Sequence, residues 1–332
     1  MASQLVAVIT GASSGVGRAT TNAFAREGAS LALIARGKDG LEGACRDVES
    51  AGGRALVVTA DVADAEALDS AAEKVETEFG PIDVWVNNAM ATVFSPFKEM
   101  TPEEFRRVTE VTYLGQVYGT MAALKRMLSR DRGVIVQVGS ALAYRGIPLQ
   151  SAYCGAKHAI QGFTEAVLTE LMHERSRVWI TMVQLPGLNT PQFDVCRTRL
   201  RRQPQPVPPV YQPEVAAEAI VWASKQRQRE VFVGGSTAVV ITGDKIAPAL
   251  GDLYLAKTGI GSQQSKELID AGRPDNLFDP LPGDRGVRGR FDKLAHDKSY
   301  QFWGVRHKRL LAGLGAAAAG AFALAARRRN GA

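Results

Sequence analysis

Cysteine is scarce in this sequence, with only three among 332 residues. Cys45, Cys154 and Cys196 are widely separated and form no CxxC pair or Cys/His cluster, which predicts neither a disulfide framework nor a bound metal. The N-terminus has no basic region before its apolar stretch, and the run Leu5–Ile9 is too short for a secretory signal. We therefore expect a cytoplasmic protein.

Nucleic-acid recognition motifs with stacking aromatic residues are also missing, although the formal net charge is +6. The basic residues gather in two places, first among residues 197–202 and then at residues 306–309 and 327–329. Solvated surface charge is the simpler interpretation of both groups. The sequence therefore predicts no nucleic-acid partner.

The residues that are present predict a large globular core, because 45% are hydrophobic and 22% are charged. Short apolar runs alternate with helical patterns through the first three-quarters of the chain, which is typical of βαβ units. We predict an α/β fold: a Rossmann-like, doubly wound, seven-stranded parallel sheet with helices on both faces. The predicted strands are Leu5–Thr10, Leu31–Ala35, Ala55–Thr59, Val84–Val86, Val134–Val138, Trp179–Gln184 and Glu230–Val233.

Two regions interrupt this alternation. Leu188–Tyr211 is rich in proline and arginine without a stable periodicity, so we interpret it as a mobile loop over the site. After residue 245 the chain is rich in glycine, proline and aspartate, which predicts an irregular C-terminal extension. The predicted organisation is a Rossmann-type domain at 1–245, an irregular extension at 246–305 and an Ala/Gly-rich, basic-flanked tail at 306–332.

A glycine-rich turn, TGASSGVG at Thr10–Gly17, follows the first predicted strand and opens a helix. This order places backbone N–H groups and the positive helix end where a pyrophosphate would lie, and glycine leaves room for its approach. The turn therefore predicts a dinucleotide site. Its cofactor-binding residues are Thr10, Gly11, Ser13, Ser14, Gly15, Val16 and Gly17.

Residue 36 indicates which dinucleotide binds. An acidic residue about twenty positions after the glycine motif would hold the ribose hydroxyls of NAD, whereas a basic one accommodates the additional phosphate of NADP. Arg36 follows Gly17 by nineteen positions (36 − 17), and no acid occurs from Ala29 to Lys38. The sequence therefore predicts NADP(H). Arg18 either assists the cofactor or is a solvated helix residue.

Three side chains have the chemistry for carbonyl reduction. Ser140 closes a predicted strand, and Tyr153 and Lys157 lie four apart in a helical pattern, so all three can converge at the carboxyl ends of the strands. A tyrosine can protonate the alkoxide left by hydride transfer if its pKa falls from about 10 towards 7, which requires roughly 4 kcal/mol. An ammonium about 4 Å away supplies energy of that order. We predict that Tyr153 is the general acid/base, that Lys157 lowers its pKa and that Ser140 orients the substrate oxygen.

Over roughly residues 4–245 the sequence resembles the short-chain dehydrogenase/reductase family. Besides the glycine motif and the Ser-Tyr-Lys set, the matching motifs are Asp61-Val62, Asn87-Asn88-Ala89 and Pro186-Gly187 with Thr190. The resemblance implies a homodimer or homotetramer built on the helices that bear Tyr113 and Tyr153. It also implies that Asp61 and Val62 contact the adenine and that Asn88 and Ala89 line the cofactor. The nicotinamide would be contacted by Pro186, Gly187 and Thr190, and further cofactor contacts would come from Tyr153 and Lys157.

Two positions depart from the family pattern. Met90 replaces the glycine of the usual NNAG motif, which places a flexible apolar side chain near the site. Thr112 aligns with the helical asparagine that supports the active-site lysine through water, so the catalytic proton relay would pass through a threonine. Phe193 and Val195, in the segment that covers the substrate, are candidate pocket residues.

Several alternatives stay open. The arginines of the loop are either solvated or placed for an acidic or phosphorylated substrate. Residues 310–326 are uncharged between basic flanks, which predicts either peripheral membrane contact or packing in an oligomer. The function predicted first is NADP(H)-dependent interconversion of a small-molecule carbonyl and an alcohol. A regulatory or scaffold protein on the same fold is the alternative, and a membrane-tethered enzyme for lipophilic ketones is a third.

Overall fold

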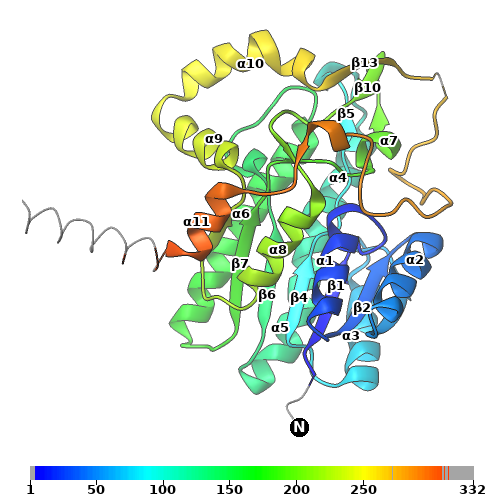
Figure 1. Ribbon diagram of the computed structural model, residues 1–332, viewed down its shortest axis with the longest axis vertical. Helices are drawn as coiled ribbons and strands as arrows, with labels where there is room; N and C mark the ends of the chain where they lie inside the picture. Colours follow the sequence, from blue (N-terminus) through cyan, green and yellow to red (C-terminus); the bar gives the residue numbers. More distant parts are fainter. Residues whose placement is uncertain (1–3, 271, 309, 311–312, 314–332) are drawn as a thin grey trace, which may run out of the picture.

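The structure is a computed structural model, and it describes residues 4–270, 272–308, 310 and 313. A seven-stranded parallel sheet occupies its centre, in the order β12-β7-β6-β4-β1-β2-β3 (Figure 1). The strands are β1 (Val6–Thr10), β2 (Ser30–Ala35), β3 (Arg54–Thr59), β4 (Val84–Asn87), β6 (Val134–Val138), β7 (Trp179–Gln184) and β12 (Glu230–Phe232). The seven strand predictions are thus confirmed, each within one residue at either end.

Helices cover both faces of this sheet, which confirms the doubly wound prediction. Side chains alternate along β1, where Ala7 and Ile9 pack on one face and Val6 and Val8 on the other. The first face is covered by α1 (Gly15–Arg26), α2 (Lys38–Ser50) and α8 (Pro213–Ala223), and the second by α3 (Ala65–Phe79), α4 (Pro102–Thr109), α5 (Gly115–Met127) and α6 (Ser151–His173). The strand order reverses between β1 and β4, where folds of this type bind ligands.

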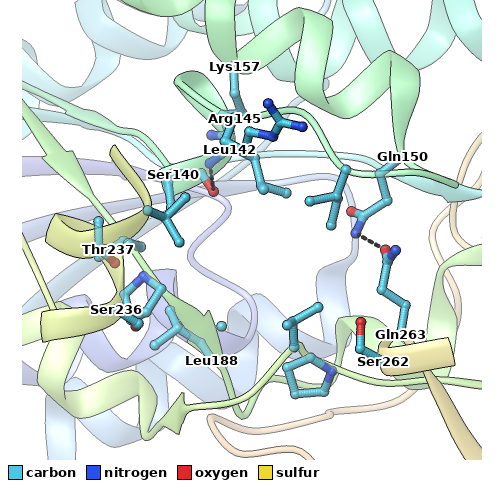
Figure 2. A pocket seen from close by; sticks show the side chains of 18 of the residues that line it. Ser140, Leu142, Arg145, Gln150, Lys157, Leu188, Ser236, Thr237, Ser262 and Gln263 are labelled. Atoms are coloured by element: carbon cyan, nitrogen blue, oxygen red, sulfur yellow. Dashed lines mark hydrogen bonds between the residues drawn. The ribbon is translucent and has the colours of Figure 1, made fainter. Parts of the chain in front are cut away.

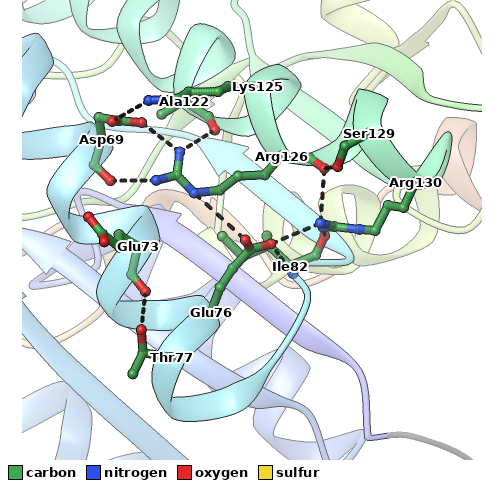
Figure 3. Close-up of polar contacts among 10 residues, drawn as sticks. All are labelled: Asp69, Glu73, Glu76, Thr77, Ile82, Ala122, Lys125, Arg126, Ser129 and Arg130. Carbon is green, nitrogen blue, oxygen red and sulfur yellow. Dashed lines mark hydrogen bonds and ion pairs between the residues drawn. The ribbon is translucent and has the colours of Figure 1, made fainter.

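A network of ion pairs joins α3 to α5 (Figure 3). Arg126 pairs with Asp69 at 2.6 Å and approaches Glu76 at 3.8 Å, while Arg130 pairs with Glu76 at 2.9 Å. The side chain of Arg126 is only 12% exposed, so this pairing is shielded from solvent more than a surface salt bridge is. The network therefore fixes α5, whose first turns bind the Asn87 side chain at the end of β4.

The C-terminal extension is more regular than predicted. Helix α9 (Gly235–Ile246) crosses the predicted boundary at 245, and α10 (Pro248–Ser262) follows directly. Pro248 at the first helical position explains where the second helix begins, and the prediction of an irregular chain was wrong there. Between β13 (Gln264–Leu268) and β14 (Ala295–His296) the described residues, 269–270 and 272–294, are irregular as predicted, apart from one 3-10 turn, Asp292–Leu294. Helix α11 (Tyr300–Arg306) then packs on α8 through Phe302 and Trp222.

The segment predicted as a mobile loop contains short regular elements. They are β8 (Gly187–Leu188), α7 (Gln192–Val195), β9 (Arg197–Thr198), β10 (Arg202–Pro204) and β11 (Val210–Tyr211), and their partners include β5 (Val93–Phe94), β13 and β14. Arg197 and Arg199 pair with Glu104, which is 2% exposed, so these two partly exposed arginines also neutralise a buried carboxylate. A buried carboxylate requires such partners.

No helix in the described part of the chain is long and apolar enough to span a membrane. The uncharged segment on which the membrane hypothesis rests falls on residues 310–326. All but residues 310 and 313 of that segment lie outside the described residues. The hypothesis therefore stays a prediction, as does the division into three regions.

Candidate functional site

Two adjoining cavities lie at the carboxyl ends of the strands. One, of about 230 Å³, is lined by the glycine turn, Arg36 and part of the C-terminal extension, and we call it the turn cavity. The other, of about 650 Å³, contains Ser140, Tyr153 and Lys157, and we call it the large cavity. The two cavities share lining residues, so a bound molecule can extend from one into the other. The shared residues include Val16, Asn88, Met90 and Thr190.

The glycine turn is held against the end of β4. The hydroxyl of Thr10 accepts the N–H groups of Asn88 and Ala89 at 2.9 and 3.1 Å, and the Asn88 side chain donates to the Thr10 carbonyl at 2.9 Å. A Cβ on Gly17 would lie 2.1 Å from the Gly11 carbonyl oxygen, and Gly11 itself has φ +68°. Only glycine fits both positions, which keeps the start of α1 open towards the turn cavity.

The turn cavity fits the phosphates of a dinucleotide. Ser13, Ser14, Gly15 and Val16 line it at the positive end of α1. Ser14 caps the helix without a side-chain hydrogen bond of its own, so its hydroxyl is available to a ligand. Asp61, Val62, Asn88, Ala89 and Thr190 line the same cavity, whereas Pro186 and Gly187 line the large one.

The two arginines near this turn have partners that the sequence did not suggest. Arg36 donates to the carbonyls of Asn276 and Phe278 at 2.6 and 2.5 Å. Arg18 pairs with Asp47 and Asp284, and its side chain is 7% exposed, so it is neither solvated nor directed at the cavity. These partners lie up to 266 residues away in sequence, beyond the reach of local patterns.

Ser140, Tyr153 and Lys157 all line the large cavity. Figure 2 shows Ser140 and Lys157. Ser140 follows β6, and its oxygen accepts the Leu142 N–H at 3.1 Å, which leaves its own hydrogen to donate. Lys157 lies 5.5 Å from the centre of the Tyr153 ring and donates to the Val138 carbonyl at 2.7 Å. Spacing along α6 and strand position thus bring the predicted set together.

Burial controls both titrating groups of this set. It lowers the pKa of Lys157 to about 7. It also raises the pKa of Tyr153, against a smaller lowering by Ser140, because burial disfavours the charged phenolate. Tyr153 is therefore protonated at neutral pH, which is the form that donates a proton. The lowering of this pKa by Lys157 stays a prediction.

The pKa of Lys157 predicts a pH-dependent stability. An unfolded lysine titrates near 10.4, so between pH 7 and about 10 the unfolded chain binds more protons and the cost of burying Lys157 falls as pH rises. Lys157→Met removes that cost and should gain more stability over the native chain at pH 6 than at pH 9.5. Urea unfolding at both values measures it, with Lys74→Met on the exposed side of α3 as control. An equal gain at both pH values would contradict the burial of a titrating amine.

Thr112 does not have the contacts of a proton relay. It lies in a π-helical turn, Glu110–Leu114, where its hydroxyl donates to the Ala91 carbonyl at 2.8 Å and accepts the Ala91 N–H at 2.9 Å. Its only donor is therefore committed, and we interpret it as a support for the chain after β4. Met90 lines both cavities, in agreement with the prediction that it shapes the pocket.

The sequence did not predict the polar residues that close the large cavity on the side of α9 and α10. Arg145 pairs with Asp244 of α9 and Asp252 of α10, and Gln150 donates to Gln263 at 2.8 Å after α10 (Figure 2). Phe193 lines the large cavity as predicted, and Val195 lines the turn cavity. The described residues contain no group of three or more His, Cys, Asp or Glu side chains that could hold a metal ion.

The fold and this pair of cavities define a Rossmann-type protein with a dinucleotide-shaped site beside a Ser-Tyr-Lys set. The model of the family described as short chain dehydrogenase matches residues 5–199. The chain belongs to this family of oxidoreductases. It is 33% identical over 286 residues to an uncharacterized oxidoreductase of Bacillus subtilis, YxnA, a match that covers 85% of this chain and 80% of that one.

Two solved structures share the fold. A metagenomic short-chain oxidoreductase in complex with NADP is 26% identical, with a TM-score of 0.59 over 69% of this chain and 96% of that one. A short-chain dehydrogenase from Streptomyces avermitilis is also 26% identical, with a TM-score of 0.64 over 79% of this chain and 100% of that one. The family relationship therefore extends to the three-dimensional structure.

Proposed function

We propose that this protein is an NADP(H)-dependent oxidoreductase that interconverts a carbonyl and an alcohol. The observation that carries the proposal is the position of Ser140, Tyr153 and Lys157 in a cavity continuous with the one formed by the glycine turn. The NADP in the metagenomic relative supports the choice of cofactor. The remaining cofactor contacts are those proposed from the family motifs.

The residues have distinct roles in this reaction. NADP(H), when bound, supplies or takes up the hydride. Ser140 donates its free hydrogen to the substrate oxygen and orients it, and Tyr153 gives that oxygen its proton as the carbonyl is reduced. Lys157 is held by Val138 beside the Tyr153 ring, where its charged form favours the phenolate left behind. Because burial raises the pKa of Tyr153, reduction is favoured at neutral pH and alcohol oxidation should accelerate as pH rises.

The large cavity indicates a lipophilic substrate. Beyond the catalytic set, its wall is mainly apolar, and helices α9 and α10 complete it. Its apolar lining includes Leu142, Ile147, Leu188, Phe193, Val240, Leu250 and Leu255. A volume of about 650 Å³ accommodates a small molecule whose carbonyl reaches Tyr153 while its apolar part fills the rest.

A series of straight-chain aldehydes and 2-ketones of increasing length tests this proposal. With NADPH, kcat/KM should rise with each added methylene by a factor of about 3–4, because burying one CH₂ contributes about 0.8 kcal/mol. Leu142→Asn should flatten this slope, whereas Leu268→Asn, 73% exposed on β13, should not. A kcat/KM that is independent of chain length would contradict a lipophilic substrate.

Arg36 should discriminate NADPH from NADH. Its guanidinium lines the turn cavity while it binds two carbonyls, so we propose that it both holds the extension and faces the additional phosphate. Arg36→Asp should weaken NADPH binding about 10–100-fold more than NADH binding, because a charge-assisted hydrogen bond is replaced by repulsion. Lys38→Asp, whose side chain is 75% exposed, is the control. Equal weakening of both cofactors would leave Arg36 a purely structural role.

The oligomeric state and the membrane contact of residues 306–332 stay predictions. The helices that bear Tyr113 and Tyr153 expose Met121 and Met172, apolar side chains that an interface between two copies would cover. A mass measurement in solution decides between monomer, homodimer and homotetramer.

A further inference from the structure

A segment of the C-terminal extension returns to the glycine turn, and we call residues 276–289 the clasp. In Figure 1 the chain leaves β13, descends on the side of α2 and then crosses back towards α11. The carbonyl of Gly286 accepts the N–H of Gly15 at 3.0 Å, and Gly289 donates to the Asn189 carbonyl at 3.2 Å. The clasp therefore spans from the phosphate-binding turn to the segment after β7.

The clasp is anchored along its length. Leu277 is 1% exposed and belongs to the same core cluster as Val62. The carbonyls on either side of Leu277 accept hydrogen bonds from Arg36, and the Asp284 carboxylate pairs with Arg18 of α1. Because one of its apolar side chains is buried and its ion pair is shielded from solvent, the clasp is a fixed part of the cavity wall.

Arg285 is the cation that this wall presents to the turn cavity. It lines that cavity together with Ser13 and Ser14, and none of the ion pairs among the described residues includes it. Its one side-chain hydrogen bond is a long one, to the Pro282 carbonyl at 3.4 Å. Arg18 and Arg36, by contrast, are engaged with carboxylates and carbonyls. A guanidinium in this position can bind a phosphate group without first breaking an ion pair.

The surroundings of Arg285 indicate which phosphate it would reach. It precedes Gly286, whose carbonyl accepts a hydrogen bond from the N–H of Gly15 at the start of α1. Because Gly286 is bound to Gly15, the neighbouring Arg285 lies at the start of α1, where a pyrophosphate would lie.

We propose that Arg285 binds the pyrophosphate of NADP(H) and that the clasp closes the turn cavity over the cofactor. The inference rests on the proposed function, because it needs a dinucleotide in this cavity. It adds a binding residue that lies outside the part of the chain matched by the family model, residues 5–199.

Equilibrium binding of NADPH and of NADH tests this inference without turnover. Arg285→Gln should weaken both cofactors by the same factor of about ten, because one charge-assisted hydrogen bond to a group common to both is lost. Arg285→Lys should recover part of the affinity, since it keeps the charge but loses the forked donors. Arg288→Gln is the matched control, because Arg288 lies on the same segment but pairs with Glu214 of α8 at 2.9 Å.

The outcomes separate this inference from the proposed function. Equal affinities for the native chain and Arg285→Gln overturn the role of Arg285 while leaving NADP(H) binding intact. A loss confined to NADPH overturns the pyrophosphate assignment, because NADH carries the same pyrophosphate. A native chain that binds neither cofactor overturns the proposed function together with the inference.

Discussion

Replacing Tyr153 by phenylalanine should reduce kcat for carbonyl reduction by about 10²–10⁴-fold, the contribution typical of a positioned general acid. The ring keeps its place on α6 beside Lys157, and only the hydroxyl that faces the large cavity is removed. The affinity for NADPH should fall far less than kcat, because the turn cavity that would hold the phosphates is untouched. Stopped-flow single turnover and fluorescence titration measure the two quantities separately.

Tyr144→Phe provides a matched control for this substitution. The Tyr144 hydroxyl donates to the Glu230 carboxylate at 2.6 Å and is not among the groups that line the large cavity. Its loss should lower stability by about 1 kcal/mol and leave kcat unchanged. If Tyr153→Phe retained native turnover, the acid/base role would be refuted and the regulatory or scaffold hypothesis would gain weight.

Gly17→Ala should weaken the binding of both NADPH and NADH, because the added methyl group displaces the turn that would hold either cofactor. The added Cβ would lie 2.1 Å from the Gly11 carbonyl oxygen and 2.7 Å from the Asn88 side chain, so the turn has to move off the end of β4. We expect a loss of NADPH affinity of at least about tenfold and a destabilisation of about 1–3 kcal/mol.

Gly162→Ala is the comparison for that change. Gly162 lies within α6 and has nothing within 4 Å of an added Cβ, so alanine there should stabilise the protein by up to about 1 kcal/mol. Urea unfolding and NADPH titration of both variants measure these opposite effects. Native affinity in Gly17→Ala would show that the turn does not need its close packing to bind the cofactor.

The sheet could be predicted from the sequence because its central strands are buried and apolar on both faces. Val134–Val138, for example, is bounded by Gly133 and Gly139, so the local sequence determines its length and places Ser140 just beyond its end. The Ser-Tyr-Lys set followed for the same reason, since strand position and a spacing of four along a helix determine where the side chains point.

The remaining features depend on partners distant in sequence. Arg36 has a predictable position but unpredictable partners, because carbonyls 240 residues away carry no sequence signal. The ion pairs of Arg197 and Arg199 could not be predicted, because Glu104, the buried acid that they neutralise, lies in α4, 93 and 95 residues earlier in the chain. The raised pKa of Tyr153 likewise reflects how deeply the folded chain buries it, which spacing along α6 does not reveal.

The central claim is that hydride passes from NADPH to a carbonyl beside Tyr153, and transfer of an isotopic label tests it most directly. The protein is incubated with NADPH carrying deuterium at both hydrogen positions of nicotinamide C4 and with the best substrate of the chain-length series, and the product is examined by mass spectrometry and NMR. We expect one deuterium on the carbinol carbon in the native chain and almost no product in Tyr153→Phe. An alcohol without deuterium on that carbon, or no alcohol from any member of the series while NADPH binds tightly, would contradict the account.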